Sequence, residues 1–331
     1  MFKARTPAID QFTRRMYTRT GVDRLGAHLE SVYGTRVGRI SELDLGVYRV
    51  DRHNGSSWVA RLFPAARLPE ATEGDAEILR ALAERDFPAE RCAVPDPVSV
   101  LDGQALLVTD HVDGVPKASR RELIRSLGGL RTFGEMLGRL HAMPGADRDV
   151  VRYGGAWHHL ADGGPHEEIA AAAALLADAE DAIQAVERPL YDSLREEVER
   201  FDDCDGLPHA LIHPDFVLEN VVASPDRGLV VIDWTGAGRG PRLWSLAFLL
   251  FSQGAQDLRR VDLVVAGYRK QLRPDPEELA RLASVIRVRP TVFDVWAFCV
   301  GRKELADVVA RAAATAELAD AIAARAIDAF G

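Results

Sequence analysis

The chain has 331 residues, of which 47% are hydrophobic and 27% are charged, and it carries a formal net charge of −9 at pH 7. Such a length gives about two domains or one bilobal unit with a sizeable core, and the composition excludes fibrous and broadly disordered proteins. An acidic chain offers no basic face to a phosphate backbone or an anionic surface, so we expect no nucleic-acid and no membrane partner.

The three cysteines lie far apart and form no C-x-x-C pair, which indicates a reducing compartment and neither a disulfide scaffold nor a zinc ribbon. No apolar run follows the first residues, so no signal peptide is predicted. The longest apolar stretch, 243–251, has about half the length of a membrane span. We therefore expect a cytoplasmic protein. Its oligomeric state stays open, with a monomer slightly preferred.

The first third of the chain predicts a small unit of mixed helices and strands. Strand formers alternate with turn residues, and the segment 51–56 has the composition of a hairpin turn. Two stretches have helical periodicity, 12–34 and 75–85. The expected strands are 44–50, 57–63, 98–101 and 105–109.

Beyond a change of composition at 110–116 the chain is mostly helical. One compact β segment interrupts the helices: strands at 221–224 and 229–232 enclose a Pro-Asp-Arg-Gly turn and predict a hairpin. The expected helices are 119–143, 166–188, 189–201, 242–253, 256–272, 276–288, 291–300 and 302–329. We predict an α+β fold with two lobes, a sheet-rich lobe over 1–112 and a helical lobe over 113–331.

Several catalytic motifs are absent from the sequence. It contains no G-x-x-x-x-G-K-[ST], no H-E-x-x-H and no G-x-S-x-G. The glycine-rich segment 236–241 is superficially similar to a dinucleotide-binding loop, but Pro241 stands at the third glycine position and no opening βαβ unit precedes it. We therefore do not interpret this segment as a dinucleotide site.

The informative residues lie around the predicted hairpin. His213 and Asp215 end an apolar strand, Asn220 follows five residues later, and the hairpin returns the chain so that Asp233 emerges beside Asn220. Two such oxygen ligands can hold Mg²⁺ against the phosphates of a nucleotide. Asp215 is then placed to orient an acceptor hydroxyl and accept its proton. Taken singly, Asp215 and Asn220 could be turn formers and Asp233 a strand cap; the joint spacing favours the site.

These runs, His213–Asn220 and Ile232–Trp234, resemble the aminoglycoside phosphotransferase and choline kinase-like family, whose members share the two-lobed protein-kinase-like fold. Leu106–Gly114 is similar to the family's lobe-connecting hinge, and Leu137–His141 to the helix beneath the catalytic loop. Gly238–Arg242 is similar to the segment that follows the metal-binding aspartate. The resemblance covers about residues 20 to 250 and implies an α+β, protein-kinase-like fold.

The resemblance implies roles for several of these residues. Asp215 corresponds to the catalytic aspartate, and Asn220 and Asp233 correspond to the magnesium ligands. Ser245 stands where the family has an aspartate that braces the catalytic loop. A second histidine that the family has within this loop is replaced here, at Val217 or Leu218.

In the small lobe, Arg61 stands where the family has a phosphate-binding lysine, and Glu77 where a helix glutamate pairs with that lysine. All but four of the 41 basic residues are arginine, so an arginine here is consistent with the composition of the whole chain. Strand alternation puts Arg61 in an apolar row, where its charge needs a partner such as Glu77. Alternatively, Glu77 is solvated and pairs with Arg80.

By the same resemblance, the adenine edge of ATP lies against the hinge backbone at about 109–112, that is at Asp110, His111 and Val112. The stretch between the hinge and the catalytic loop is where the family builds its acceptor pocket. The candidates there are Trp157, His158, Asp162 and Glu167.

The sequence therefore predicts a small-molecule kinase: an ATP- and Mg²⁺-dependent O-phosphotransferase acting on a hydroxyl of an aminoglycoside or of another antibiotic or metabolite. Its acceptor, and with it a role in antibiotic resistance, biosynthesis or catabolism, stays open. The first alternative is a kinase-like nucleotide-binding protein without catalysis that acts as a scaffold or regulator, for which Arg61 is the best support. The second, a protein kinase, is disfavoured because no G-x-G-x-x-G loop precedes the strand of Arg61.

Overall fold

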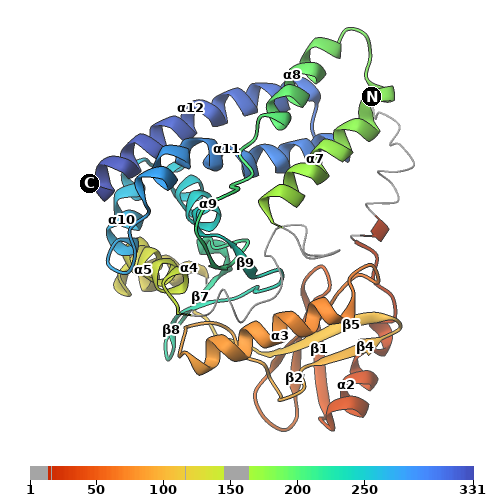
Figure 1. Ribbon diagram of the computed structural model, residues 1–331. Helices are drawn as coiled ribbons and strands as arrows, with labels where there is room; N and C mark the ends of the chain where they lie inside the picture. Colours follow the sequence, from red (N-terminus) through yellow and green to blue (C-terminus); the bar gives the residue numbers. More distant parts are fainter. Residues whose placement is uncertain (1–13, 16, 116, 145–163) are drawn as a thin grey trace.

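The computed structural model describes residues 14–15, 17–115, 117–144 and 164–331. Figure 1 shows a sheet with the helix α3 (Pro69–Glu84) at one end of the molecule and the long helices at the other. The hairpin of β7 (Val221–Ser224) and β8 (Gly228–Val231) lies between them. This arrangement confirms the predicted α+β fold, in which a sheet-rich part precedes a mainly helical part.

An antiparallel sheet of five strands, in the order β1-β2-β3-β5-β4, forms the N-terminal part. Helix α2 (Leu25–Tyr33) packs through Leu25 and Leu29 on one face of this sheet, and α3 (Pro69–Glu84) packs through its own apolar residues on the other. The strands are β1 (Val37–Asp44), β2 (Val47–Arg52), β3 (Trp58–Leu62), β4 (Val98–Leu101) and β5 (Gln104–Asp110). The strand β1 is not predicted from the sequence, because its apolar residues Val37, Ile40 and Leu43 do not alternate with polar ones.

Helix α3 begins at Pro69, six residues before the predicted start. Proline suits the first helical position because the amide it lacks has no partner within the helix there. The first turns carry few apolar residues, which hides the helix from a search for periodicity. The inner side of these turns is nevertheless buried: Thr72 and Asp75 have no exposed surface, and both accept hydrogen bonds from the buried Arg67.

The predicted helix 119–143 is in fact two helices, because Gly128 and Gly129 both adopt positive φ and break the run. Conversely, the chain continues through Pro290 as one helix where two were predicted. The helices of this part are α4 (Lys117–Ser126), α5 (Gly129–His141), α7 (Pro165–Ala179), α8 (Arg188–Glu199), α9 (Arg242–Gly254), α10 (Arg259–Tyr268), α11 (Pro276–Cys299) and α12 (Leu305–Phe330). Among the described residues, no helix is long and apolar enough to cross a membrane.

Two small antiparallel pairs lie within the helical part. The predicted hairpin is confirmed as β7 (Val221–Ser224) and β8 (Gly228–Val231). A second pair joins β6 (His209–Ile212) to β9 (Gly238–Pro241). The chain between α3 and β4 also docks on β8, because the Val231 amide donates to the Pro88 carbonyl at 2.9 Å. The hairpin is therefore fixed to the N-terminal part as well as to the helices.

Candidate active site

His213 ties the loop after β6 to the end of β8. Its side chain has no exposed surface, and burial lowers its pKa, so the ring is neutral. Its Nδ1 accepts the Asp215 amide proton at 3.0 Å, which leaves the proton on Nε2 to be donated to the Ile232 carbonyl at 3.1 Å. One ring therefore sets the distance between the segment of Asp215 and the strand that leads into Asp233.

The hairpin brings Asn220 and Asp233 to the same end of β7 and β8. The Ile232 amide donates to the Asn220 carbonyl at 2.9 Å, and Asp233 is the next residue, held at φ 66°. The Asn220 side-chain nitrogen donates to the Asp215 carbonyl at 3.0 Å, so its amide oxygen is the atom left for a ligand. A carboxylate and an amide oxygen suit Mg²⁺, which takes few protein ligands together with phosphate and water. The residues present therefore fit a magnesium ion.

The turn at Asp233 is held by Glu90, a residue that the sequence analysis did not select. Glu90 is 6% exposed, and its Oε1 accepts the amide protons of Asp233 at 2.7 Å and Trp234 at 3.4 Å. Its Oε2 accepts the Thr109 hydroxyl at 3.0 Å. Burial raises the pKa of Glu90, and the nearby Arg61 holds that rise down. This carboxylate fixes the backbone of a candidate metal ligand to β5.

Arg61, on β3, forms an ion pair with Asp233. Burial disfavours the charged guanidinium, yet the surrounding carboxylates, Asp233 foremost, outweigh burial and raise the pKa of Arg61. The predicted partner Glu77 is not brought to Arg61: it is exposed, and no ion pair of the described residues joins the two. Arg80, the alternative partner of Glu77, donates instead to the Pro95 carbonyl.

The acid that α3 contributes to this region is Asp75, two residues before Glu77. It is fully buried, and its charge adds to those that raise the pKa of Arg61. Its Oδ1 accepts the Gly236 amide proton at 3.1 Å, and its Oδ2 accepts from Arg67 at 2.8 Å. Asp75 therefore links α3 to the segment that follows Asp233.

Asp215 has a basic partner that sequence reasoning missed. The Arg289 Nη2 atom, from α11, donates to the Asp215 Oδ1 atom at 2.6 Å. The Asp215 side chain is 36% exposed, whereas that of Arg289 is 2% exposed. The buried carboxylate of Glu168, on α7, lies 3.9 Å from the Arg289 Nε atom. No motif marks Arg289, which lies 74 residues beyond Asp215 in the sequence, on a helix that carries two other arginines.

Two further side chains brace the catalytic loop. The Ser245 hydroxyl donates to the His213 carbonyl at 3.0 Å, so the serine contacts this loop from α9. On the other side, Arg120 of α4 donates to the carbonyls of Leu218 and Val221. The loop is therefore held at both ends by hydrogen bonds to its backbone.

Comparison with known proteins identifies the family. Residues 40–282 match the model of the phosphotransferase enzyme family (APH), which is well over half of the chain. The chain belongs to this family. The match confirms the resemblance expected from the motifs around Asp215 and Asp233. Among curated protein sequences, none matches the chain significantly.

Solved structures show the same kinase-like fold. The choline kinase LicA from Streptococcus pneumoniae has a TM-score of 0.59 and 16% identity, over 89% of this chain and 98% of that one. An aminoglycoside phosphotransferase from Alicyclobacillus acidocaldarius has a TM-score of 0.57 and 15% identity, over 89% and 92%. The amicoumacin kinase hAmiN, solved with AMP-PNP and Ca²⁺, has a TM-score of 0.58 and 15% identity, over 95% and 92%.

In this member of the phosphotransferase family the hinge backbone is partly engaged by the protein itself. The Asp110 amide donates to the Arg91 carbonyl and the His111 amide to the Ser57 carbonyl, at 2.9 and 3.0 Å. Among the described residues, no acceptor receives the Val112 amide proton. Burial raises the pKa of Asp110 and lowers that of His111. Of the three predicted hinge residues, Val112 therefore keeps a backbone donor free for a ligand.

Of the four residues predicted for the acceptor pocket, the structure describes one, Glu167. Trp157, His158 and Asp162 lie outside the described residues. Glu167 is exposed, and its carboxylate accepts the Gly164 amide proton at 2.6 Å, so it caps the start of α7. The acid of this helix that turns inward is its neighbour Glu168.

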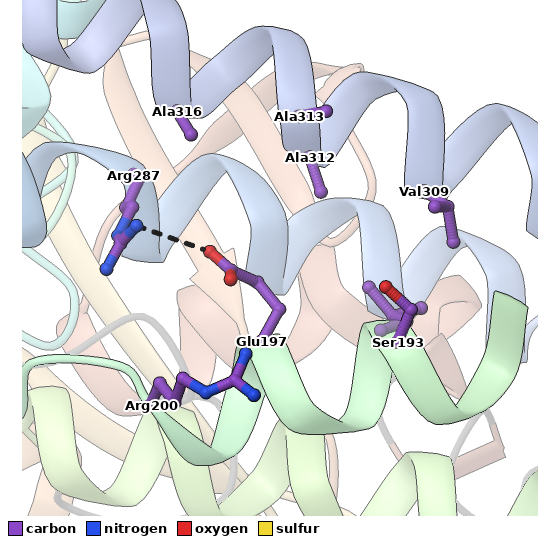
Figure 2. A pocket seen from close by; sticks show the side chains of 9 residues that line it. Ser193, Glu197, Arg200, Arg287, Val309, Ala312, Ala313 and Ala316 are labelled. Atoms are coloured by element: carbon purple, nitrogen blue, oxygen red, sulfur yellow. Dashed lines mark ion pairs between the residues drawn. The ribbon is translucent and has the colours of Figure 1, made fainter.

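A cavity of about 190 Å³ opens elsewhere, among α8, α11 and α12 (Figure 2). Glu197 and Arg287, whose charged atoms lie 3.6 Å apart, point toward each other across it. None of the predicted site residues lines this cavity, and it is smaller than a typical ligand pocket. We assign it no role in the activity.

Proposed function

We propose that this protein is an ATP-dependent O-phosphotransferase that transfers the γ-phosphoryl group to a hydroxyl of a small molecule. The observation that carries the proposal is the double link of Asn220: its side chain donates to the backbone of Asp215, and its carbonyl accepts from the amide of Ile232, the residue before Asp233. Asn220 therefore fixes the positions of two carboxylates relative to each other, Asp215 for the acceptor and Asp233 for the metal.

In this proposal residues 1–112 bind the nucleotide and residues 113–331 supply the catalytic loop and the acceptor pocket. Asn220 Oδ1 and the Asp233 carboxylate would hold Mg²⁺, which neutralises phosphate charge when it is bound. Arg61 turns from Asp233 to the phosphates, where its planar fork suits phosphate oxygens. The Val112 amide donates to the adenine edge.

The reaction is a displacement at the γ-phosphorus. The bond to the bridging oxygen of ADP breaks, a bond to the acceptor oxygen forms, and the hydroxyl proton passes to Asp215. Asp215 is suited to this role because its carboxylate is partly exposed while its backbone is fixed by His213 and Asn220. Most of the rate then comes from positioning and charge neutralisation.

The acceptor is a small molecule that carries a hydroxyl. The names of similar structures span a choline kinase, an aminoglycoside phosphotransferase and an amicoumacin kinase, so amino alcohols and antibiotics are the first acceptors to test. We place the enzyme in the cytoplasm and expect a monomer. A screen that follows ATP consumption over amino alcohols, aminoglycosides, other antibiotics, sugars and nucleosides tests the proposal. Nucleotide binding without turnover across this panel would favour a non-catalytic role.

The two carboxylates have separable roles that calorimetry can distinguish. Asp233→Asn removes the charged oxygen that faces the metal, so we expect the affinity for AMP-PNP with Mg²⁺ to fall by at least about tenfold. Asp215→Asn keeps the volume of its side chain and alters only the acceptor side, so it should bind nucleotide like the wild type and lose turnover. Equal loss of affinity in the two variants would contradict these assignments.

A further inference from the structure

Arg289 is a charged side chain buried in the helical core, 1% exposed. Removing a guanidinium from water costs several kcal/mol unless anions and hydrogen bonds compensate it. The residue lies on α11, and its cation is 4.2 Å from the ring centre of Phe248 and 5.2 Å from that of Phe293. These two rings fix the direction of the guanidinium, so its hydrogen bond to Asp215 has a defined geometry.

A contribution to stability does not by itself explain the ion pair between Arg289 and Asp215. Asp215 is 36% exposed and would be solvated without a partner. The Nε and Nη1 atoms of Arg289 are buried, and within the described part of the chain neither has a hydrogen-bond partner, which lowers the stability of the fold. An arginine selected only to stabilise the core would satisfy more of its donors.

We propose that Arg289 is a positioning residue for Asp215, held in the core by Glu168, and that it leaves Oδ2 of Asp215 as the oxygen that faces the acceptor hydroxyl. The inference rests on the proposed function and adds a residue to it. Arg289 binds Oδ1 at 2.6 Å, whereas no described residue donates to Oδ2. The acceptor side of the carboxylate is thereby selected before any acceptor binds.

Glu168 gives this arrangement its charge balance. It is fully buried, and its Oε2 atom lies 3.9 Å from the Arg289 Nε atom. The Arg289 guanidinium therefore has a carboxylate near its Nε atom as well as the Asp215 carboxylate at Nη2. A carboxylate at this distance compensates part of the charge of the buried guanidinium and so helps to keep Arg289 in place beside Asp215.

The test compares two arginines of the same helix. Arg289→Met removes the contact with Asp215. Arg287→Met, the matched control, removes an ion pair with Glu197 on the cavity of Figure 2, away from the site. We measure kcat with ATP, Mg²⁺ and the acceptor found in the screen, or water where none is found. Calorimetry gives the affinity for AMP-PNP with Mg²⁺. A misplaced reacting group costs about 100-fold in rate, so Arg289→Met should lose about that factor in kcat at unchanged affinity, and Arg287→Met neither.

Two more variants separate positioning from folding. Arg289→Lys keeps the charge on a shorter side chain and should recover part of the lost kcat. The double variant Glu168→Gln/Arg289→Met removes both buried charges, so it should stay folded in thermal unfolding and still show the loss in kcat. This variant carries the test where the single one does not fold.

The outcomes separate this inference from the proposed function. An active wild type whose kcat survives Arg289→Met within about threefold overturns the positioning role alone. The same holds if kcat, nucleotide affinity and thermal stability fall together in every Arg289 variant and lysine restores nothing. A wild type that neither binds nor consumes ATP overturns the proposed function and this inference together.

Discussion

Replacing Arg61 with alanine tests the link between the sheet and the hairpin. The ion pair with Asp233 joins β3 to the end of β8, with the two side chains 17% and 36% exposed. Breaking a fully buried pair costs about 3–5 kcal/mol. Water reaches Asp233 and reduces this cost, so we expect Arg61→Ala to lower the free energy of unfolding by about 2 kcal/mol, which lowers Tm by about 3 °C.

The same variant should bind nucleotide less tightly. Without Arg61, Asp233 and Glu90 lose their nearest cation, and the phosphates of ATP would enter a site with uncompensated negative charge. We expect the affinity for AMP-PNP with Mg²⁺ to fall about tenfold, equivalent to about 1.4 kcal/mol, and turnover to fall with it. Arg61→Lys keeps the charge and should retain or raise activity, because lysine is the residue that the resemblance places here.

Calorimetry and thermal unfolding on the two variants decide between the enzyme and a structural ion pair. If Arg61 is only structural, Arg61→Ala lowers Tm while its nucleotide affinity equals that of the wild type. That combination would refute the phosphate role. A variant with unchanged Tm would refute the energetic argument as well, because the pair with Asp233 would then contribute nothing measurable.

Two other predictions concern the core. Burial lowers the pKa of His141 to about 3 from 6.5, so its neutral form adds stability above pH 6.5 that is lost as the pH falls toward 3. Between about pH 7.5 and about pH 5.5, the free energy of unfolding should therefore fall by about 1.4 kcal/mol less in His141→Phe than in the wild type. Chemical denaturation of both proteins at the two pH values checks this. Glu278 is 1% exposed and binds Arg242 at 2.8 and 2.5 Å. Glu278→Ala should therefore lower the free energy of unfolding by about 3 kcal/mol and Tm by about 4 °C; an unchanged Tm would contradict it.

The residues that sequence analysis brought together are those linked by short-range geometry. Asp215 and Asn220 lie on one loop. The hairpin that returns the chain to Asp233 is predicted by the Pro-Asp-Arg-Gly composition of its turn. Spacing therefore predicts their proximity without knowledge of the remaining fold. The α+β class is predicted in the same way, because most of the elements show local periodicity in the sequence.

The partners of these carboxylates could not be predicted in the same way. Arg289 reaches Asp215 across 74 positions, and Glu90 reaches Asp233 across 143. Such pairs depend on how whole elements pack. The error at α3 has a simpler cause: two residues on a helix differ by about 200° in direction, so Asp75 faces inward and Glu77 faces solvent. A step of one residue, about 100°, separates the exposed Glu167 from the buried Glu168.

Each of the two candidate carboxylates, Asp233 and Asp215, forms an ion pair with an arginine. The two ion pairs should respond differently to a bound nucleotide. The pair of Arg61 with Asp233 spans the sheet and the hairpin, and it must open for Asp233 to face a metal and Arg61 to face phosphates. The pair of Arg289 with Asp215 lies within the helical part and involves no group that the nucleotide needs. Nucleotide binding should therefore rearrange the first pair and leave the second intact. In the proposed function, the acceptor side of the site is therefore formed before ligands bind, whereas the nucleotide side is completed by the nucleotide itself.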